Sequence, residues 1–315
     1  MFESITGHQD VLGKIQTALQ STQSGAFLFF GPQSVGKKTV ALSAARFLLC
    51  VGDKTENCSC LSCRRLNDGH PDFFIAGNRG RIKVEDIGLF FDFISSQPFL
   101  SSLKVSIFNN AEDMTWEASN KLLKALEEHS NHYFFLITAN LERVIPTVRS
   151  RCFHFKFDPL RSDDLTNILW KKLGFELPKA KVLGWLGSQG NIDVFKDPST
   201  LLETRASVFS LFPQIVKKET CQVLDFIDRY PSESGALLDI FLLLLTDMLL
   251  IKNGLDSEIV NKDMEDDLKK FCEKTDYKFL IVLGNMFNSI KEHKHLNIDL
   301  SSRMKNNTMK MELVG

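Results

Sequence analysis

One stretch, FLFFGPQSVGKKT at residues 27–39, constrains the fold more than any other part of the chain. It begins with a continuous apolar run, which is typical of a strand buried on both faces of a parallel sheet. The pattern G-x-x-x-x-G-K follows, with Gly31, Gly36 and Lys37 in the defined positions. Between a strand and a helix, such a loop closes its backbone N–H groups around phosphate oxygens. The stretch therefore predicts a phosphate loop in an α/β fold; an ordinary glycine turn is the alternative.

Strands and helices are expected to alternate through the first half of the chain. The sequence predicts strands within 26–30, 72–77, 103–110, 132–140 and 147–157, and helices at 1–24, 37–50 and 115–128, while 81–99 passes from strand to a helix that ends near Pro98. Such alternation forms a parallel sheet with helices on both faces. Beyond residue 158 the pattern is helical only. We expect an α/β domain at 1–160, a helical lid at 161–205 and an all-α domain at 206–315, frayed over 301–315.

Composition indicates a soluble globular protein. Hydrophobic residues make up 43% and charged residues 24% of the 315 residues, and the net charge is −1, so no overall charge attracts nucleic acid or an anionic membrane. The most apolar stretch, 236–251, is shorter than a bilayer span and carries Asp239 and Asp247, so we expect a buried helix. No secretory signal pattern opens the chain. These features predict a cytoplasmic protein without a membrane segment.

The residues that would hold and use magnesium are replaced in this chain. The position after the loop lysine is Lys38 instead of Ser or Thr, and Thr39 lies about 100° further round the helix. Asn109 and Asn110 stand at the end of a later strand, where a nucleotide-hydrolysing enzyme places acids. A neutral amide is a weak metal ligand and a poor base. We therefore expect no ATP hydrolysis, although ATP binding without turnover stays compatible with the loop.

Four of the seven cysteines lie close together, at Cys50, Cys58, Cys60 and Cys63. Thiols stay reduced in the cytoplasm, so the cluster favours a metal site over disulfides. Four thiolates can bind Zn²⁺ tetrahedrally, and a site with four protein ligands has no open catalytic position. The spacing C-x7-C-x-C-x2-C therefore predicts structural zinc, with free reduced thiols as the alternative.

Two segments carry a resemblance to a known family. Residues Ala118 to Glu128 fit A-x-N-x-L-L-K-x-L-E-E, and Pro146 to Cys152 fit P-T-x-x-S-R-C. Together with the opening FESITGHQDVLGKIQTAL at 2–19, they resemble the clamp-loader subunits of bacterial DNA polymerase III, which are AAA+ proteins. The gamma/tau subunits keep the magnesium-binding groups that this chain lacks. The resemblance is therefore greatest to the delta-prime branch of the family, strongly over residues 1 to about 160.

The resemblance implies a role for Arg151, within the S-R-C segment. In this family the arginine reaches across a subunit interface to the γ-phosphate that the neighbouring subunit holds. A guanidinium is always charged and fits phosphate in a fork, so it can stabilise transition-state charge in trans. The resemblance also implies a hetero-pentamer with gamma/tau and delta, joined by a collar of C-terminal domains, that loads a sliding clamp on primed DNA. A solvated surface arginine is the alternative.

The chain departs from the family in two further places. The family's cysteine insertion has the longer spacing C-x8-C-x2-C-x2-C. Gly190 and Asn191 stand where related ATPases carry an arginine that senses their own nucleotide. Two rival functions remain: an active ATP-driven motor with unusual Mg²⁺ ligation, and a degenerate AAA+ adaptor that binds nucleic acid through its zinc element and basic residues. Salt-dependent DNA binding by the isolated chain would support the adaptor.

Overall fold

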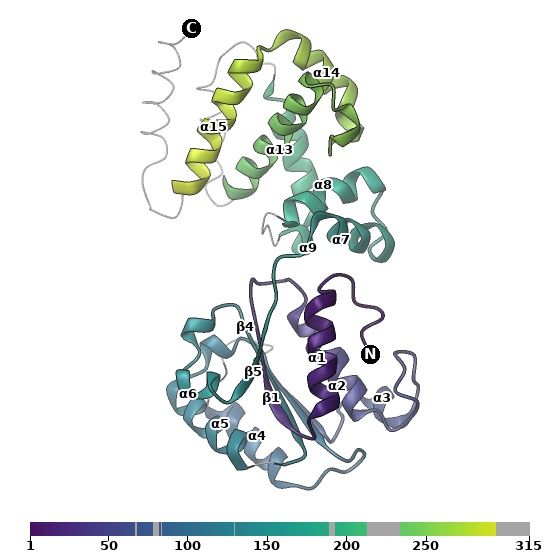
Figure 1. Ribbon diagram of the computed structural model, residues 1–315, viewed down its shortest axis with the longest axis vertical. Helices are drawn as coiled ribbons and strands as arrows, with labels where there is room; N and C mark the ends of the chain where they lie inside the picture. The colour runs from purple at the N-terminus through teal and green to yellow at the C-terminus, as the bar shows by residue number, and fades with distance from the viewer. Residues whose placement is uncertain are drawn as a thin grey trace. The chain divides into compact units, whose positions relative to one another are not determined.

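The computed structural model describes residues 1–66, 68–77, 82, 84–128, 130–188, 193–212 and 234–293. The chain forms two compact units, Met1–Leu160 and Arg161–Gly315, and each is described by itself (Figure 1). Two sequence-based predictions, the missing sensing arginine at Gly190 and Asn191 and the frayed end at 301–315, lie outside the described residues.

A five-stranded parallel sheet forms the centre of the first unit, in the order β2-β3-β4-β1-β5. The strands are β1 (Gly25–Phe30), β2 (Phe73–Ala76), β3 (Lys104–Phe108), β4 (His132–Thr138) and β5 (Cys152–Lys156). The alternation of strands and helices along the sequence predicted this arrangement. Because the strands are parallel, the carboxyl ends of β1, β4 and β3 lie at one edge of the sheet, where ligands bind in folds of this class.

Helices cover both faces of the sheet, as Figure 1 shows. They are α1 (Gln9–Ser21), α2 (Lys37–Leu49), α4 (Val84–Ser95), α5 (Trp116–Glu128) and α6 (Pro146–Arg149), with the short α3 (Leu61–Arg65), η1 (Ala111–Asp113) and η2 (Leu141–Arg143) between them. Side chains alternate along β1, so Phe27 and Phe29 pack with α1 and α2, while Leu28 packs with α4, α5 and α6. Each face thus has its own apolar core.

Local details of the first unit refine the sequence predictions. α1 is shorter than the predicted helix 1–24, because Gly7 (φ 83°) and His8 (φ 59°) adopt left-handed backbone conformations directly before it. Thr115 caps α5 as its position suggests, since its Oγ1 accepts a hydrogen bond from the Ala118 N–H at 3.2 Å. α4 ends ahead of Pro98, also as expected.

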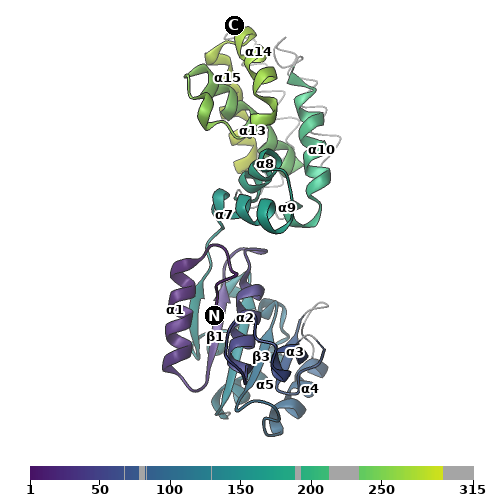
Figure 2. The ribbon, with the colours of Figure 1, turned by 90° about the vertical axis from the view of Figure 1, so that its right-hand side faces the viewer.

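The described part of the second unit contains helices and no strand (Figure 2). They are α7 (Ser162–Asn167), the π-helical η3 (Ile168–Lys172), α8 (Leu177–Ser188), α9 (Asp193–Lys196), α10 (Pro198–Phe209), α13 (Ser234–Lys252), η4 (Asp256–Glu258), η5 (Lys262–Met264), α14 (Glu265–Lys274) and α15 (Tyr277–His293). One apolar cluster includes Leu183, Val208, Leu244 and Phe287. Its members lie on both sides of the predicted lid boundary near residue 205, and that boundary stays a prediction.

The apolar segment at 236–251 belongs to α13 and is mostly buried in that cluster. Among the described helices, none combines the length and apolar character needed to span a bilayer. Asp247 is fully buried within α13, where its carboxylate accepts hydrogen bonds from the Asn261 N–H at 2.8 Å and the Asn261 side-chain amide at 2.7 Å. Burial raises the pKa of Asp247, and these hydrogen bonds oppose the shift.

Candidate functional site

The predicted phosphate loop connects β1 to α2. Gly31 (φ 138°) and Gly36 (φ 99°) adopt conformations that favour glycine. A Cβ atom on Gly31 would also come within 2.0 Å of the Phe157 carbonyl oxygen, so only glycine fits there. From the segment before α1, His8 Nε2 forms a hydrogen bond with the Val35 carbonyl at 2.8 Å. Glycine geometry and this contact together determine the shape of the loop.

Lys37 turns into the loop, whereas the two residues after it do not. Its Nζ donates hydrogen bonds to the carbonyl oxygen of Gly31 at 2.7 Å and to that of the next residue, and the side chain is 6% exposed. Burial lowers the pKa of Lys37 to about 8, while the negative charge of Glu112 acts in the opposite direction. Lys38 and Thr39 are exposed in the first turn of α2.

The two asparagines lie at the carboxyl edge of the sheet, directly after β3. The Asn109 N–H donates to the Ala76 carbonyl at 3.0 Å. Asn110 has a left-handed backbone (φ 56°), and its side-chain amide donates to the Gly77 carbonyl at 3.4 Å. Both side chains are half-buried. These residues support the turn after β3 and place neutral amides, not carboxylates, at this position.

Glu112 is a carboxylate beside the loop that the sequence analysis did not identify. Its Oε1 accepts a hydrogen bond from the Ala139 N–H at 2.8 Å, at the end of β4. Its Oε2 is buried and has no hydrogen-bond partner among the described residues. The negative charge of Glu112 favours the protonated form of Lys37. The sequence offered one sign of this role: Glu112 lies three residues beyond Asn109, at the end of the sheet where the loop also lies.

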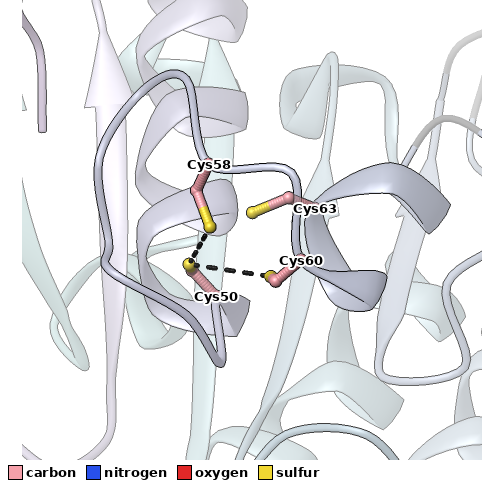
Figure 3. A group of neighbouring side chains, drawn as sticks. All are labelled: Cys50, Cys58, Cys60 and Cys63. Carbon is pink, nitrogen blue, oxygen red and sulfur yellow. Dashed lines mark hydrogen bonds between the residues drawn. The ribbon is translucent and has the colours of Figure 1, made fainter.

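The four cysteine thiols point toward one another, as Figure 3 shows. Their Sγ atoms all lie within 4.8 Å of one another. Sγ of Cys50 is 3.5 Å from that of Cys58 and 3.9 Å from that of Cys60. A tetrahedral site with Zn–S bonds of about 2.3 Å separates its sulfurs by about 3.8 Å, whereas a disulfide bond is about 2.05 Å long. The thiols, including Cys63, are therefore spaced to share a metal ion.

Neighbouring residues hold this cysteine cluster in place. A Cβ atom on Gly52 would lie only 2.7 Å from Sγ of Cys58, so glycine is required in that turn. Arg46 of α2 donates from Nη2 to the Cys58 carbonyl at 2.7 Å. The buried Ser62 hydroxyl forms a hydrogen bond with Nε2 of His70 at 2.7 Å. These contacts attach the insertion to α2 and to the segment that enters β2.

One of the four thiols ionises more readily than an ordinary cysteine. Burial opposes ionisation of Cys60, but hydrogen bonds from the backbone N–H groups of Cys63 and Val51 outweigh it and lower the pKa of Cys60 to about 6. Burial raises the pKa of Cys63. Since the thiolate is the form that binds metals, the lowered pKa of Cys60 favours metal binding by this thiol.

Arg151 lies between α6 and β5, at the surface of the first unit. Its Nη1 donates to the Thr147 carbonyl at 3.0 Å, and its Nη2 forms an ion pair with Glu127 in α5. The side chain remains 40% exposed. The guanidinium is thus held by two groups of its own chain and is open to a further ligand. No pattern in the sequence indicated the contact with Glu127.

Comparison with known families and relatives agrees with this architecture. Residues 7–161 match the family described as DNA polymerase III, delta subunit, and residues 200–300 match the C-terminal part of that family. The delta-prime subunit of Bacillus subtilis DNA polymerase III is 27% identical, over 78% of this chain and 78% of its own length. The delta-prime subunit of Pseudomonas aeruginosa is 34% identical over 40% of this chain and 41% of its own length.

Gamma subunits are also similar to this chain. The DNA polymerase III gamma subunit of Buchnera aphidicola from Schizaphis graminum is 33% identical over 53% of this chain, which spans 48% of that relative. A solved gamma-subunit-related protein from Thermotoga maritima aligns with 95% of this chain and 98% of its own, at 18% identity and a TM-score of 0.41. With family matches in both units, the chain belongs to the clamp-loader subunits of bacterial DNA polymerase III, as a delta-prime-like member.

Proposed function

We propose that this chain is a non-hydrolysing subunit of a cytoplasmic clamp loader. It supplies Arg151 to the ATP site of an adjoining gamma/tau subunit. With its first two domains it acts as a comparatively rigid jaw while the loader places a sliding clamp on primed DNA. Residues 161–205 serve as the lid domain. Residues 206–315 join the gamma/tau and delta subunits in the collar of a hetero-pentamer.

The position of Arg151 relative to its own phosphate loop is the observation that carries this proposal. β5 pairs with β1 in parallel, with Cys152 opposite Ala26. Arg151 therefore lies at the end of the sheet where the parallel strands begin, whereas the loop begins at Gly31, at the end where the strands finish. At about 3.3 Å per residue, the two are about 20 Å apart along the strands. An arginine so placed cannot serve its own loop, which supports action on a neighbour's phosphate.

The chain's own loop supports the non-hydrolysing part of the proposal. Lys38 and Thr39 are exposed in α2, and Asn109 and Asn110 place neutral amides after β3. With no Ser or Thr directly after the loop lysine, and with neutral amides at the positions where the acids are expected, the loop lacks two parts that phosphoryl transfer uses. Lys37 keeps a cation beside the loop, so binding of ATP without turnover remains consistent with the proposal.

Recovery of partners from the native cytoplasm tests the proposal. The tagged full-length chain is expected to co-purify with gamma/tau and delta, and the purified chain alone is expected to show no ATPase activity. Turnover of Mg²⁺-ATP by the isolated chain would instead favour the motor. Salt-dependent DNA binding by the isolated chain, without recovery of gamma/tau or delta from a lysate that contains both, would favour the adaptor.

We further propose that Cys50, Cys58, Cys60 and Cys63 bind a structural Zn²⁺ ion. The chain purified without chelators is expected to carry about one zinc ion per molecule, because four converging thiolates complete a tetrahedral site. Elemental analysis after gel filtration measures the metal. The variant Cys63→Ser should lose most of the zinc. Cys272→Ser, a matched control at a buried cysteine outside the cluster, should keep it. A zinc-free chain with four freely alkylated thiols would contradict the metal site.

A further inference from the structure

The ion pair between Arg151 and Glu127 joins two separate elements of the first unit. Glu127 lies in the last turn of α5, and Arg151 follows α6. The two side chains are 50% and 40% exposed, so the pair lies at the surface in contact with water. Exposed pairs of this kind contribute little to stability. The contact therefore calls for an explanation other than stabilisation of the fold.

The location of Glu127 at the C-terminal end of α5 also calls for an explanation other than stabilisation of the fold. The C-terminal end of a helix carries partial negative charge, which disfavours carboxylates and favours cations. The last turn of α5 nevertheless contains Glu127 and Glu128 and no basic residue. The carboxylate of Glu127 and the helix end thus form one negative surface, and Arg151 supplies the cation from outside the helix.

Arg151 is restrained at its backbone as well as at its guanidinium. Its N–H donates to the Val148 carbonyl at 3.2 Å, and its Nη1 donates to the Thr147 carbonyl at 3.0 Å. An arginine side chain has many rotamers, and each one that is excluded beforehand reduces the entropy lost when the guanidinium meets its ligand. With Nη1 and Nη2 both held, the guanidinium has a defined direction and its remaining N–H donors are available.

We propose that Glu127 is a positioning residue for Arg151. It holds the guanidinium in the orientation in which it meets the terminal phosphate of the nucleotide in the adjoining subunit. This inference rests on the proposed trans role of Arg151. Glu127 touches neither the nucleotide nor the attacking water, and it acts only through the arginine.

The clamp loader assembled from gamma/tau, delta and variants of this chain tests the inference. Glu127→Ala is expected to lower kcat for ATP hydrolysis at the adjoining site by about 10- to 100-fold, since misplacement of a catalytic group by about 1 Å has effects of that size. KM for ATP should stay unchanged. Glu127→Gln should retain most of the activity, because its amide oxygen can still accept a hydrogen bond from Arg151.

Glu128→Ala is the matched control, because it removes the same charge from the same helix end without touching Arg151. It should leave kcat unchanged, and its Tm should equal that of Glu127→Ala. A double variant completes the design. In the Arg151→Ala background, Glu127→Ala should cause no further loss of kcat, since a positioning residue has no effect once its arginine is absent.

The possible results distinguish failure of the positioning role of Glu127 from failure of the proposed trans role of Arg151. Unchanged hydrolysis in Arg151→Ala would overturn the trans role itself. A large loss in Arg151→Ala together with normal or raised kcat in Glu127→Ala would leave the trans role intact and overturn the positioning role. Equal losses in Glu127→Ala and Glu128→Ala would also overturn it, because they would indicate an effect of helix-end charge alone.

Discussion

Replacing Arg151 by alanine is expected to reduce ATP hydrolysis at the adjoining subunit's site by about 10³-fold or more, which is the range for arginines that act in trans. The side chain of Arg151 is 40% exposed, and its backbone lies about 20 Å from its own phosphate loop along the strands. Its loss removes a permanent charge and a fork of donors from the neighbour's transition state. In single-turnover phosphate release by the assembled loader, the contribution of that one site should disappear.

Two further variants test whether the loss of ATP hydrolysis is specific to the guanidinium of Arg151. Arg151→Lys keeps the charge but not the planar fork, so we expect an intermediate rate. Arg143→Ala removes a neighbouring surface arginine that pairs with Asp113 at 3.2 Å and is 56% exposed. A loader assembled with this variant should hydrolyse ATP at the normal rate. If Arg151→Ala and Arg143→Ala gave the same rates, Arg151 would be an ordinary surface residue.

Replacing Arg205 by alanine is expected to destabilise the second unit by about 2–3 kcal/mol, because it removes the hydrogen bonds of a buried guanidinium and leaves the side-chain oxygen of buried Asn261 without its donor. Arg205 is 5% exposed and donates from Nη1 to Asn261 at 2.9 Å and to Asp263 at 3.0 Å. Burial acts to raise the pKa of Asp263, but the hydrogen bond and positive charge of Arg205 hold that pKa below its usual range. The pair therefore stabilises the unit above the carboxyl's unfolded pKa and is lost as the pH falls through the lowered value.

Urea unfolding of the full chain measures this effect. In a Trp116→Phe background the remaining tryptophans, Trp170 and Trp185, lie in the second unit and report on it alone. Arg161→Ala removes a largely exposed arginine in the same unit and should change stability by less than about 0.5 kcal/mol. An equally small change in Arg205→Ala would show that the contacts of Arg205 with Asn261 and Asp263 contribute no net stability.

Local patterns were sufficient to predict most of the first unit. Apolar runs predicted β1, β3 and β4, because a strand buried on both faces must be apolar along its length. The same argument does not apply to β2 and β5, which lie at the two ends of the sheet and are less buried. Thr115 predicted the start of α5, since a hydroxyl can satisfy a free N–H at a helix end. The predicted start of α1 was wrong, because His8 adopts a left-handed conformation that no local pattern indicated.

By itself the sequence determined the parallel sheet, the position of the phosphate loop and the set of four clustered cysteines, since each depends on residues near one another in the chain. Tertiary structure decided which charges meet. The charged partners of Arg151 and Arg205, Glu127 and Asp263, come from other elements, and Arg205 and Asn261 are 56 positions apart. Periodicity and spacing describe a single element, so they do not identify a contact that forms only when two elements pack together.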